Sequence, residues 1–376
     1  MLKRTPLFEA HWELGGKLIE FGGWEMPVQY TSIIDEHTTV RKAAGIFDIS
    51  HMGEIVVSGA CAEAFLNHLL TNDARKLSLG QGQYTLMCSE TGGTVDDLYV
   101  YRLDSQEYLL IVNASRIDAD VAWIQEAEEA FDPGDTLKIE NVSDRTGAVA
   151  VQGPAVAHFI DAVFRGTTRA SQLTKNQIGT FRMGSIEARV SRTGYTGEDG
   201  FEVVACSEDI LKIWNALIEA GRPHGIKPAG LGARDTLRTE VCYPLYGHEL
   251  DEETGPVEAG LGFFVAYDKG DFIGRAALLR KKESGASRKL VAFKSLEKSA
   301  PPRPGYTVWN QRDGGEQIGT ICSGTLSPSL GIGIGMAYIR PGDAGIDKTL
   351  YFEVRGRRSP VLTAKKPLYR KQVDQS

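Results

Sequence analysis

Two glycines precede a strand that opens with two aspartates, at residues 92–101, and this order decides which side chains share a face. Successive side chains along a strand point to opposite faces of its sheet. Asp97 therefore shares a face with Tyr99 and Tyr101, and Asp96 points the other way. A carboxylate at the start of a tyrosine-lined face suits a site for a flat, partly apolar ligand that carries nitrogen atoms. The alternative is that the two aspartates only end a turn.

A second stretch, residues 191–202, repeats this arrangement. A glycine turn carries Tyr195, and Glu202 follows on the next expected strand. The repetition favours a binding role for both carboxylate-bearing strands. An ordinary surface glutamate is the alternative for Glu202.

Length and composition exclude several classes of protein. A chain of 376 residues is long for one core, so two or three domains are expected. The formal net charge of −7 argues against nucleic acid as a partner, because phosphate binding needs basic patches. The five scattered cysteines include no Cys-x-x-Cys pair, which favours a reducing cytoplasm over a disulfide framework or a zinc site. We find no secretory signal core and no apolar run of the roughly 18 residues that a membrane span needs.

Helical and strand patterns alternate up to about residue 284 and indicate an α+β body. Beyond that point the sequence changes to short β-rich runs separated by turns, which predicts a domain boundary and a small all-β domain. The expected helices cover residues 61–70, 117–131, 207–221 and 275–282. The expected strands include 107–112 and 148–152 in the body and 289–293, 306–309, 318–324, 333–339 and 349–354 beyond the boundary.

Several common chemistries lack their motifs here. The sequence has no phosphate-binding loop, no dinucleotide fingerprint, no nucleophile elbow and no metal-binding histidine pair. We expect no metal site, and we interpret His51 as a structural hydrogen-bonding group. Arg234 and Arg238 lie four residues apart on an expected helix, where they either form a salt-bridged surface or place one arginine in a site. With Asn113 at the end of a strand, the remaining polar groups indicate binding and proton transfer rather than covalent catalysis.

A series of short stretches, read in order up to about residue 340, closely resembles the T-protein family of the glycine cleavage system, the tetrahydrofolate-dependent aminomethyltransferases. Each stretch alone is weakly specific, and their common order is very specific. The stretches are Thr5-Pro6-Leu7, Phe21–Tyr30, Gly45–Gly53, Gly80–Thr85, Gly92–Leu98, Ser191–Glu202, Gly230–Asp235, Pro244–His248, Asp268–Gly274 and Ser323–Pro328.

The resemblance implies a three-domain cloverleaf with folate in a central channel. The body would span residues 1–284, with residues 1–50 and 140–284 forming one domain and residues 51–139 another. A barrel-like β domain would span residues 285–376. The implied reaction transfers a one-carbon unit from the aminomethyl-lipoyl arm of the H-protein to tetrahydrofolate, giving methylenetetrahydrofolate and ammonia. This places the chain in glycine catabolism and one-carbon metabolism in the cytoplasm, with no nucleic-acid or membrane partner.

The resemblance also assigns roles to residues. The family's acid falls on Asp97. Its tetrahydrofolate contacts fall on Met52, Tyr84, Tyr99, Tyr101, Ile111, Asn113, Tyr195, Glu202, Arg234 and, near the C-terminus, Arg370. No flavin is expected, because the chain lacks the length and the fingerprint of the flavin-linked relatives. A non-catalytic folate-binding module and a folate-dependent demethylase that needs no H-protein are the two rival functions.

Overall fold

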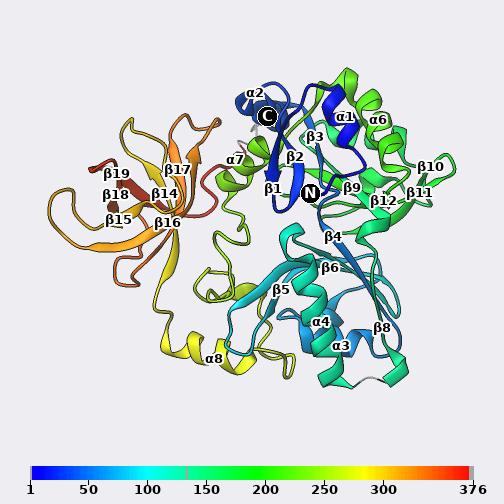
Figure 1. Ribbon diagram of the computed structural model, residues 1–376, viewed down its shortest axis with the longest axis horizontal. Coiled ribbons are helices and arrows are strands. Elements are labelled where there is room, and N and C mark those ends of the chain that lie inside the picture. Colours follow the sequence, from blue (N-terminus) through cyan, green and yellow to red (C-terminus); the bar gives the residue numbers. More distant parts are fainter. Residues whose placement is uncertain (1, 133, 372–376) are drawn as a thin grey trace. The chain divides into compact units, whose positions relative to one another are not determined.

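Two sheets, each covered on one face by helices, make up most of the first of two structural units (Figure 1). The structure is a computed structural model, and it describes residues 2–132 and 134–371. The first unit comprises Met1–Cys88, Val95–Arg234 and Phe264–Ile273. The second comprises Ser89–Thr94, Asp235–Phe263 and Gly274–Ser376. The domain division expected from the sequence stays a prediction.

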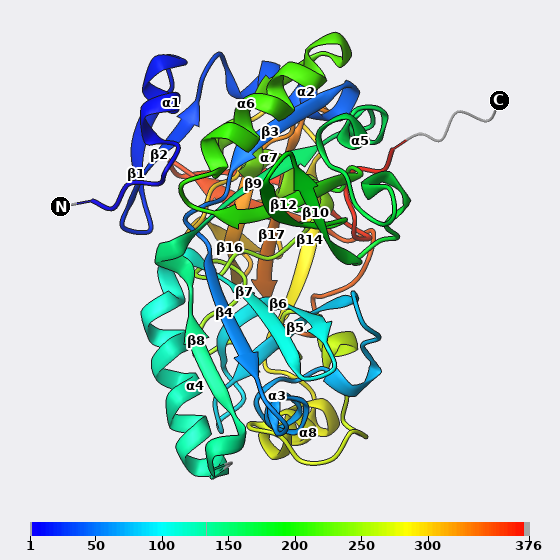
Figure 2. The ribbon, with the colours of Figure 1, turned by 90° about the vertical axis from the view of Figure 1, so that its right-hand side faces the viewer.

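The five-stranded sheet carries the strand that opens with the two aspartates. Helices α3 (Ala62–Leu69) and α4 (Ile117–Phe131) cover one face of this sheet, as Figure 2 shows. Their apolar side chains recur at helical spacing, so each helix presents one stripe to the sheet. The strand order is β5 (Gly82–Cys88), β6 (Thr94–Asp104), β7 (Glu107–Val112), β4 (Gly53–Ser58) and β8 (Lys138–Asn141).

Strand β6 has one face in the core and one face outside it. Leu98 and Val100 pack beneath the two helices with β4 and β7. Tyr101 lies on the opposite face, in a smaller cluster with Leu109 and Ile178. The alternation predicted from the sequence is therefore confirmed.

The six-stranded sheet is covered by α5 (Ile160–Val163) and α6 (Ile210–Gly221). Phe201 and Val203 of the sheet pack with Trp214 of α6, whose side chain is only 1% exposed. The strand order is β10 (Ile178–Met183), β11 (Ile186–Ser191), β12 (Gly200–Cys206), β9 (Thr146–Gln152), β3 (Ala44–Asp48) and β13 (Ile226–Pro228), with β13 parallel to β3.

The N-terminal segment is connected to this sheet by buried polar contacts. His11 of α1 (Phe8–Glu13) lies 2.8 Å from Asp48 at the end of β3, and both side chains are fully buried. Thr5 donates a further hydrogen bond of 2.6 Å to the same carboxylate. The remaining elements of this segment are the hairpin β1 (Lys17–Phe21) and β2 (Trp24–Gln29) and the helix α2 (Ile33–Lys42).

The second unit contains a closed six-stranded barrel with its own apolar core. Helix α7 (Leu231–Val241) leads from the first unit into the second, and α8 (Arg275–Ser284) precedes the barrel. The α+β class and the C-terminal all-β barrel predicted from the sequence are both confirmed. The strand order is β14 (Lys289–Ser295), β17 (Gly333–Ile339), β16 (Gln317–Leu326), β15 (Thr307–Trp309), β18 (Thr349–Val354) and β19 (Arg357–Ala364).

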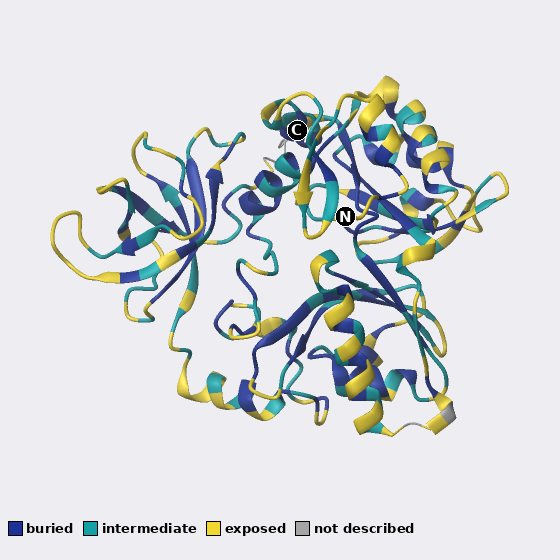
Figure 3. Ribbon diagram, viewed as in Figure 1, coloured by how far each residue is buried: buried dark blue, intermediate teal, exposed yellow. Residues whose placement is uncertain are grey.

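Burial is concentrated in the strands and on the inner faces of the helices (Figure 3). Among the described residues, no helix is both long and apolar enough to cross a membrane.

The core of the six-stranded sheet yields a stability prediction. Trp214→Ala should lower the free energy of unfolding by about 3–5 kcal/mol, because it removes a large buried side chain and leaves a cavity. Trp12→Ala is the matched control, since the side chain of Trp12 is 69% exposed, and it should change that free energy by no more than about 0.5 kcal/mol. Urea denaturation followed by circular dichroism measures both. Equal effects of the two substitutions would contradict this account of the core.

Candidate functional site

Asp97 lies on β6 within hydrogen-bonding distance of two side chains from neighbouring strands. The hydroxyl of Tyr84, on β5, donates to Asp97 Oδ2 over 2.8 Å. The side-chain amide of Asn113, just after β7, donates to Asp97 Oδ1 over 3.0 Å. The carboxylate is thus held in one orientation from both sides of its strand.

Asn113 also connects Asp97 to the buried carboxylate of Asp96. Its side-chain nitrogen lies 2.9 Å from Asp96 Oδ1, and its backbone N–H donates to Asp96 Oδ2 over 2.9 Å. Asp120 of α4 lies close enough to Asp96, on the helix side of the sheet, for each carboxyl group to affect the pKa of the other. Asn113 therefore contacts both aspartates of the strand, and Asp120 lies beside one of them.

Burial and mutual repulsion raise the proton affinity of these carboxyl groups. Burial, followed by the charge of Asp96, raises the pKa of Asp97 to about 7. Burial, followed by the same charge, raises the pKa of Asp120 to about 10, so Asp120 is protonated at neutral pH. Asp97 is left as a carboxyl group that gains and loses a proton close to neutral pH.

The tyrosines predicted for this face form a row beside Asp97. The ring centroids of Tyr84 and Tyr99 are 6.2 Å apart, and Tyr99 stacks on Tyr101 at 5.6 Å. The ring of Tyr101 lies over Gly82 of β5, where an added Cβ would come within 2.3 Å of it. A side chain at position 82 would therefore push this ring out of the row.

Glu202 lies on β12 of the other sheet and is held by a residue of the glycine turn. Thr193 donates from its hydroxyl to Glu202 Oε2 over 2.6 Å, and that hydroxyl also lies 3.0 Å from the hydroxyl of Tyr101. Gln152 donates to the backbone carbonyl of Thr193 over 3.0 Å. A Cβ on Gly194 would come within 1.8 Å of this glutamine, so the turn requires glycine there.

A series of contacts connects the two carboxyl groups: the tyrosine row beside Asp97 ends at Tyr101, whose hydroxyl meets the Thr193 hydroxyl that is bonded to Glu202. Arg234 at the start of α7 extends this group, since its guanidinium lies 4.7 Å from the ring centroid of Tyr195. Burial lowers the pKa of Arg234, and the charges of Glu202 and Tyr195 oppose that effect. These are two carboxyl groups, one arginine and a row of aromatic rings, as the sequence predicts for a flat ligand that carries nitrogen atoms.

The structure shows fewer interactions between the cluster and the remaining residues that were predicted to contact folate. Ile111 lies on β7 in the apolar cluster of Tyr99 and Tyr101, and Met52 lies in the turn between β3 and β4. Next to it, burial lowers the pKa of His51 to about 4, so this histidine is neutral. Arg370 is exposed and belongs to the second unit. The functional roles of all these residues stay predictions.

Sequence reasoning missed several residues of this cluster. Asp120 had a signal, because a carboxylate three residues after Ile117 falls on the apolar stripe of α4. Thr193 lies inside a stretch recognised from the sequence, but nothing in the sequence indicated that its hydroxyl bonds to Glu202. Asn176, which accepts a hydrogen bond of 3.0 Å from Tyr99, and Phe264, whose ring contacts Tyr84, had no local signal.

Within residues 2–132 and 134–371, no group of three or more His, Cys, Asp or Glu side chains is arranged to hold a metal ion.

Comparison with known proteins places this chain in a family. Residues 7–269 match the GCVT N-terminal domain, and residues 288–370 match the glycine cleavage T-protein C-terminal barrel domain. An aminomethyltransferase of Bacillus licheniformis is 46% identical over 377 residues, covering 99% of this chain and all of the relative. The chain belongs to the glycine cleavage T-protein family.

Further relatives agree over the whole length. An aminomethyltransferase of Bacillus subtilis is 45% identical over 375 residues, covering 99% of this chain and 100% of the relative. The crystal structure of the glycine cleavage system aminomethyltransferase T from Bartonella henselae matches with a TM-score of 0.89 at 31% identity, over 98% of each chain. The resemblance to the T-protein family drawn from the short sequence stretches is thereby confirmed.

The hydrogen bond from Tyr84 yields a prediction about proton affinity. Tyr84→Phe should raise the pKa of Asp97 from about 7 to about 8 or above, because a bond that stabilises the ionised carboxylate is lost. A titration by carbon-13 NMR of the carboxyl groups measures this, with the Asp97 signal assigned by its loss in Asp97→Asn. An unchanged pKa in Tyr84→Phe would show that the hydroxyl does not act on this carboxylate.

Proposed function

We propose that this chain transfers the one-carbon unit of an aminomethyl-lipoyl H-protein to tetrahydrofolate, with release of ammonia. The observation that carries the proposal is the full-length similarity to aminomethyltransferases, at 46% and 45% identity. The titratable carboxyl group beside a row of tyrosines supports it, because it offers both a proton acceptor and a surface for a flat ring. The cytoplasmic location expected from the sequence belongs to the same proposal.

The overall reaction moves two protons. The methylene carbon leaves both the lipoyl sulfur and the amino nitrogen, and it forms bonds to N5 and N10 of tetrahydrofolate. Each folate nitrogen gives up one proton. One proton converts the departing amino group to ammonia, and the other restores the thiol of the dihydrolipoyl arm.

Asp97 is the residue to which we assign this proton transfer. A carboxyl group with a pKa of about 7 exchanges protons readily in both directions at neutral pH. In its ionised form it also stabilises the cationic character that develops on the one-carbon unit as ammonia leaves. Neither role requires a covalent bond to the protein.

Glu202 is the proposed anchor of the pterin ring. A carboxylate accepts two adjacent N–H donors side by side, and the pterin edge offers such a pair. The hydrogen bond from Thr193 fixes the orientation of this carboxylate. Tyr84, Tyr99, Tyr101 and Tyr195 are proposed to pack against the folate rings. Met52, Ile111, Asn113, Arg234 and Arg370 complete the proposed contacts.

Mixing the protein with aminomethyl-loaded H-protein and tetrahydrofolate, and measuring ammonia, tests the function. Ammonia release that requires all three components supports the proposal. Folate binding without ammonia release would favour a non-catalytic folate-binding module. One-carbon transfer from a small methylated amine in the absence of the H-protein would favour a demethylase.

Loss of the Asp97 charge should lower the rate much more than the affinity. Asp97→Asn is expected to keep the fold and most of the folate affinity and to lower kcat roughly 10²–10³-fold, by analogy with the loss of one oxyanion-stabilising group. The matched control is Asp104→Asn at the exposed end of the same strand, which should leave kcat unchanged. Turnover of Asp97→Asn near the wild-type rate would remove this residue from the reaction.

Loss of the Glu202 carboxylate should act on binding. Glu202→Ala is expected to weaken tetrahydrofolate binding by about a hundredfold, because hydrogen bonds to a charged group are lost and water replaces part of the loss. Glu187→Ala, on the adjacent strand and 60% exposed, is the control. Calorimetric titration separates the two. A folded Glu202→Ala protein with wild-type affinity would return Glu202 to the ordinary surface residues.

A further inference from the structure

The segment Phe264–Ile273, here called the strap, belongs to the first unit although the chain on both sides of it belongs to the second. It contains the stretch Asp268–Gly274 that the sequence analysis singled out and that the proposed reaction does not use. Among the described residues, no helix or strand other than a short helical turn ending at Phe264 includes any part of the strap. Its position therefore depends on hydrogen bonds and on apolar packing, since Val265 and Phe272 are buried and Ile273 packs against the core of the five-stranded sheet.

Backbone groups fasten the strap to the segment that follows α3. The N–H of Ala266 donates to the carbonyl of Thr71 over 2.9 Å, and the N–H of Ile273 donates to the carbonyl of His68 over 3.0 Å. The hydroxyl of Thr71 in turn donates to the carbonyl of Phe264 over 3.1 Å. These bonds follow the strap from its first residue to its last.

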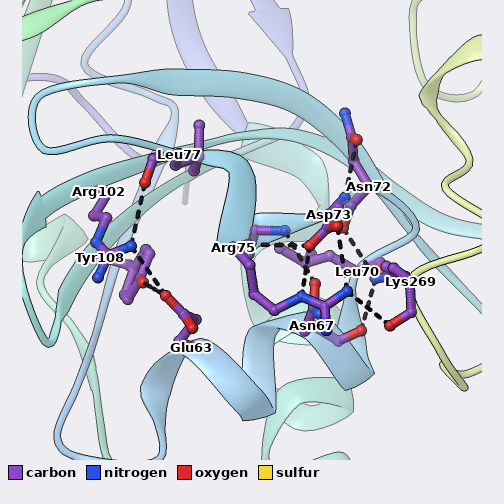
Figure 4. A network of polar contacts seen from close by, with 11 residues as sticks. Glu63, Asn67, Leu70, Asn72, Asp73, Arg75, Leu77, Arg102, Tyr108 and Lys269 are labelled. Atoms are coloured by element: carbon purple, nitrogen blue, oxygen red, sulfur yellow. Dashed lines mark hydrogen bonds and ion pairs between the residues drawn. The ribbon is translucent and has the colours of Figure 1, made fainter.

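The side chain of Lys269 attaches the strap to the C-terminal end of α3 and the residues after it. Its buried ammonium group donates to the backbone carbonyls of Asn67, at 2.6 Å, of Asn72, at 2.9 Å, and of Leu70 (Figure 4). An ammonium group has three donors, and these three carbonyls accept all of them. Asn67 and Leu70 lie at the C-terminal end of α3, where carbonyls lack helical partners and a positive charge is favourable.

A second bond holds the backbone of the same residue. The guanidinium of Arg75 donates to the carbonyl of Lys269 over 2.8 Å and pairs with Asp73 at 3.0 Å (Figure 4). Lys269 is thus held at both its side chain and its backbone. Burying an ammonium group costs free energy, as the lowering of the pKa of Lys269 to about 7 by burial reflects. The described part of the structure shows no other role for the strap that would account for this cost in free energy.

The first residue of the strap contacts the site. The ring of Phe264 meets the ring of Tyr84 edge to face, with centroids 4.7 Å apart and planes at 69°. Tyr84 is the residue whose hydroxyl donates to Asp97 over 2.8 Å. The ring of Tyr99 also lies near this ring, with centroids 6.2 Å apart and planes at 64°. The phenol of Tyr84 therefore contacts both the strap and the tyrosine row.

We propose that Phe264, fastened by Lys269, is a positioning residue that holds the Tyr84 hydroxyl on the Asp97 carboxylate. Without its ring, the Tyr84 side chain gains freedom and its bond to Asp97 is populated less. The effect on turnover rests on the proposed function, whereas the effect on the proton affinity of Asp97 does not. The competing account is that the strap only stabilises the fold.

A double-mutant cycle separates these accounts. Asp97 is titrated by carboxyl NMR in the wild type, Phe264→Ala, Tyr84→Phe and the double variant. The charged or titratable groups around Asp97 are Asp96, Asp120 and Tyr84, and the first two are unchanged throughout. We expect Phe264→Ala to raise the pKa of Asp97 toward the Tyr84→Phe value, and the double variant to match Tyr84→Phe. Phe264→Tyr keeps the ring and should restore the wild-type titration.

Three further measurements complete the test. Phe264→Ala should lower kcat by about 2- to 10-fold, the range of one aromatic pair, with KM for tetrahydrofolate within about twofold of wild type. Phe263→Ala is the matched control, because the neighbouring Phe263 side chain is 92% exposed and should have no effect on the titration. Lys269→Met should reproduce the titration of Phe264→Ala and speed hydrogen exchange of the strap amides.

The outcomes are distinct. A folded Phe264→Ala protein in which Asp97 titrates as in the wild type, or a Phe264→Ala effect that persists undiminished in the Tyr84→Phe background, overturns the inference. If Phe264→Ala does not fold, Phe264→Leu replaces it, because leucine keeps apolar volume without the ring. Absence of ammonia release by the wild type would defeat the proposed function instead, and the titrations would still decide the role of Phe264.

Discussion

The contact of Asn113 with Asp96 and Asp97 is the interaction on which the rest of the site depends. Carboxyl groups this close cannot all ionise away from water, because repulsion and desolvation both favour the protonated forms. Asn113 donates to both aspartates, and Asp120 beside Asp96 has its pKa raised to about 10 and is protonated at neutral pH. Asp97, on the other face of the strand, has its pKa raised to about 7. One asparagine and the alternation of the strand thus give two adjacent aspartates different surroundings.

The site is assembled from both sheets of the first unit, and hydroxyl groups make the connection. Tyr99 donates to Asn176, which precedes β10, and Tyr101 meets Thr193, which precedes β12. Each tyrosine therefore packs its apolar ring against its own sheet, and its hydroxyl bonds to a residue next to a strand of the other sheet. Through Tyr101 and Thr193, this arrangement connects β6 with Glu202 of β12. It suits the proposed reaction, which depends on orienting a flat co-substrate and moving protons.

Much of the fold follows from local pattern, and the exceptions have physical causes. Strands β17 and β18 have the bounds expected from the sequence, and α3 differs from the expected helix only at its ends. Strand β19 was missed because Pro360 and its neighbouring arginines are unusual within a strand. In the barrel, the pairing of β19 with β14 ends at Val361, so Pro360, which has no N–H, lies just outside that ladder. The guanidinium of Arg358 stacks over the ring of Trp309 at 3.5 Å. A residue type that is rare in strands can therefore occur in one where its neighbours in the folded structure allow it.

The sequence by itself determined the alternation that sends Asp96 and Asp97 to opposite faces, the tyrosine row beside Asp97, and the family. These properties reside in short stretches, and period-two alternation needs no distant contact. Only the tertiary structure decided that Asp97 titrates near neutral pH, that Thr193 holds Glu202, and that Phe264 contacts Tyr84. Proton affinity depends on burial and on nearby charges and hydrogen bonds, and for Asp97 these neighbours come from β5, the end of β7 and α4. Residues separated by up to about 180 positions, as Tyr84 and Phe264 are, meet only when the chain has folded.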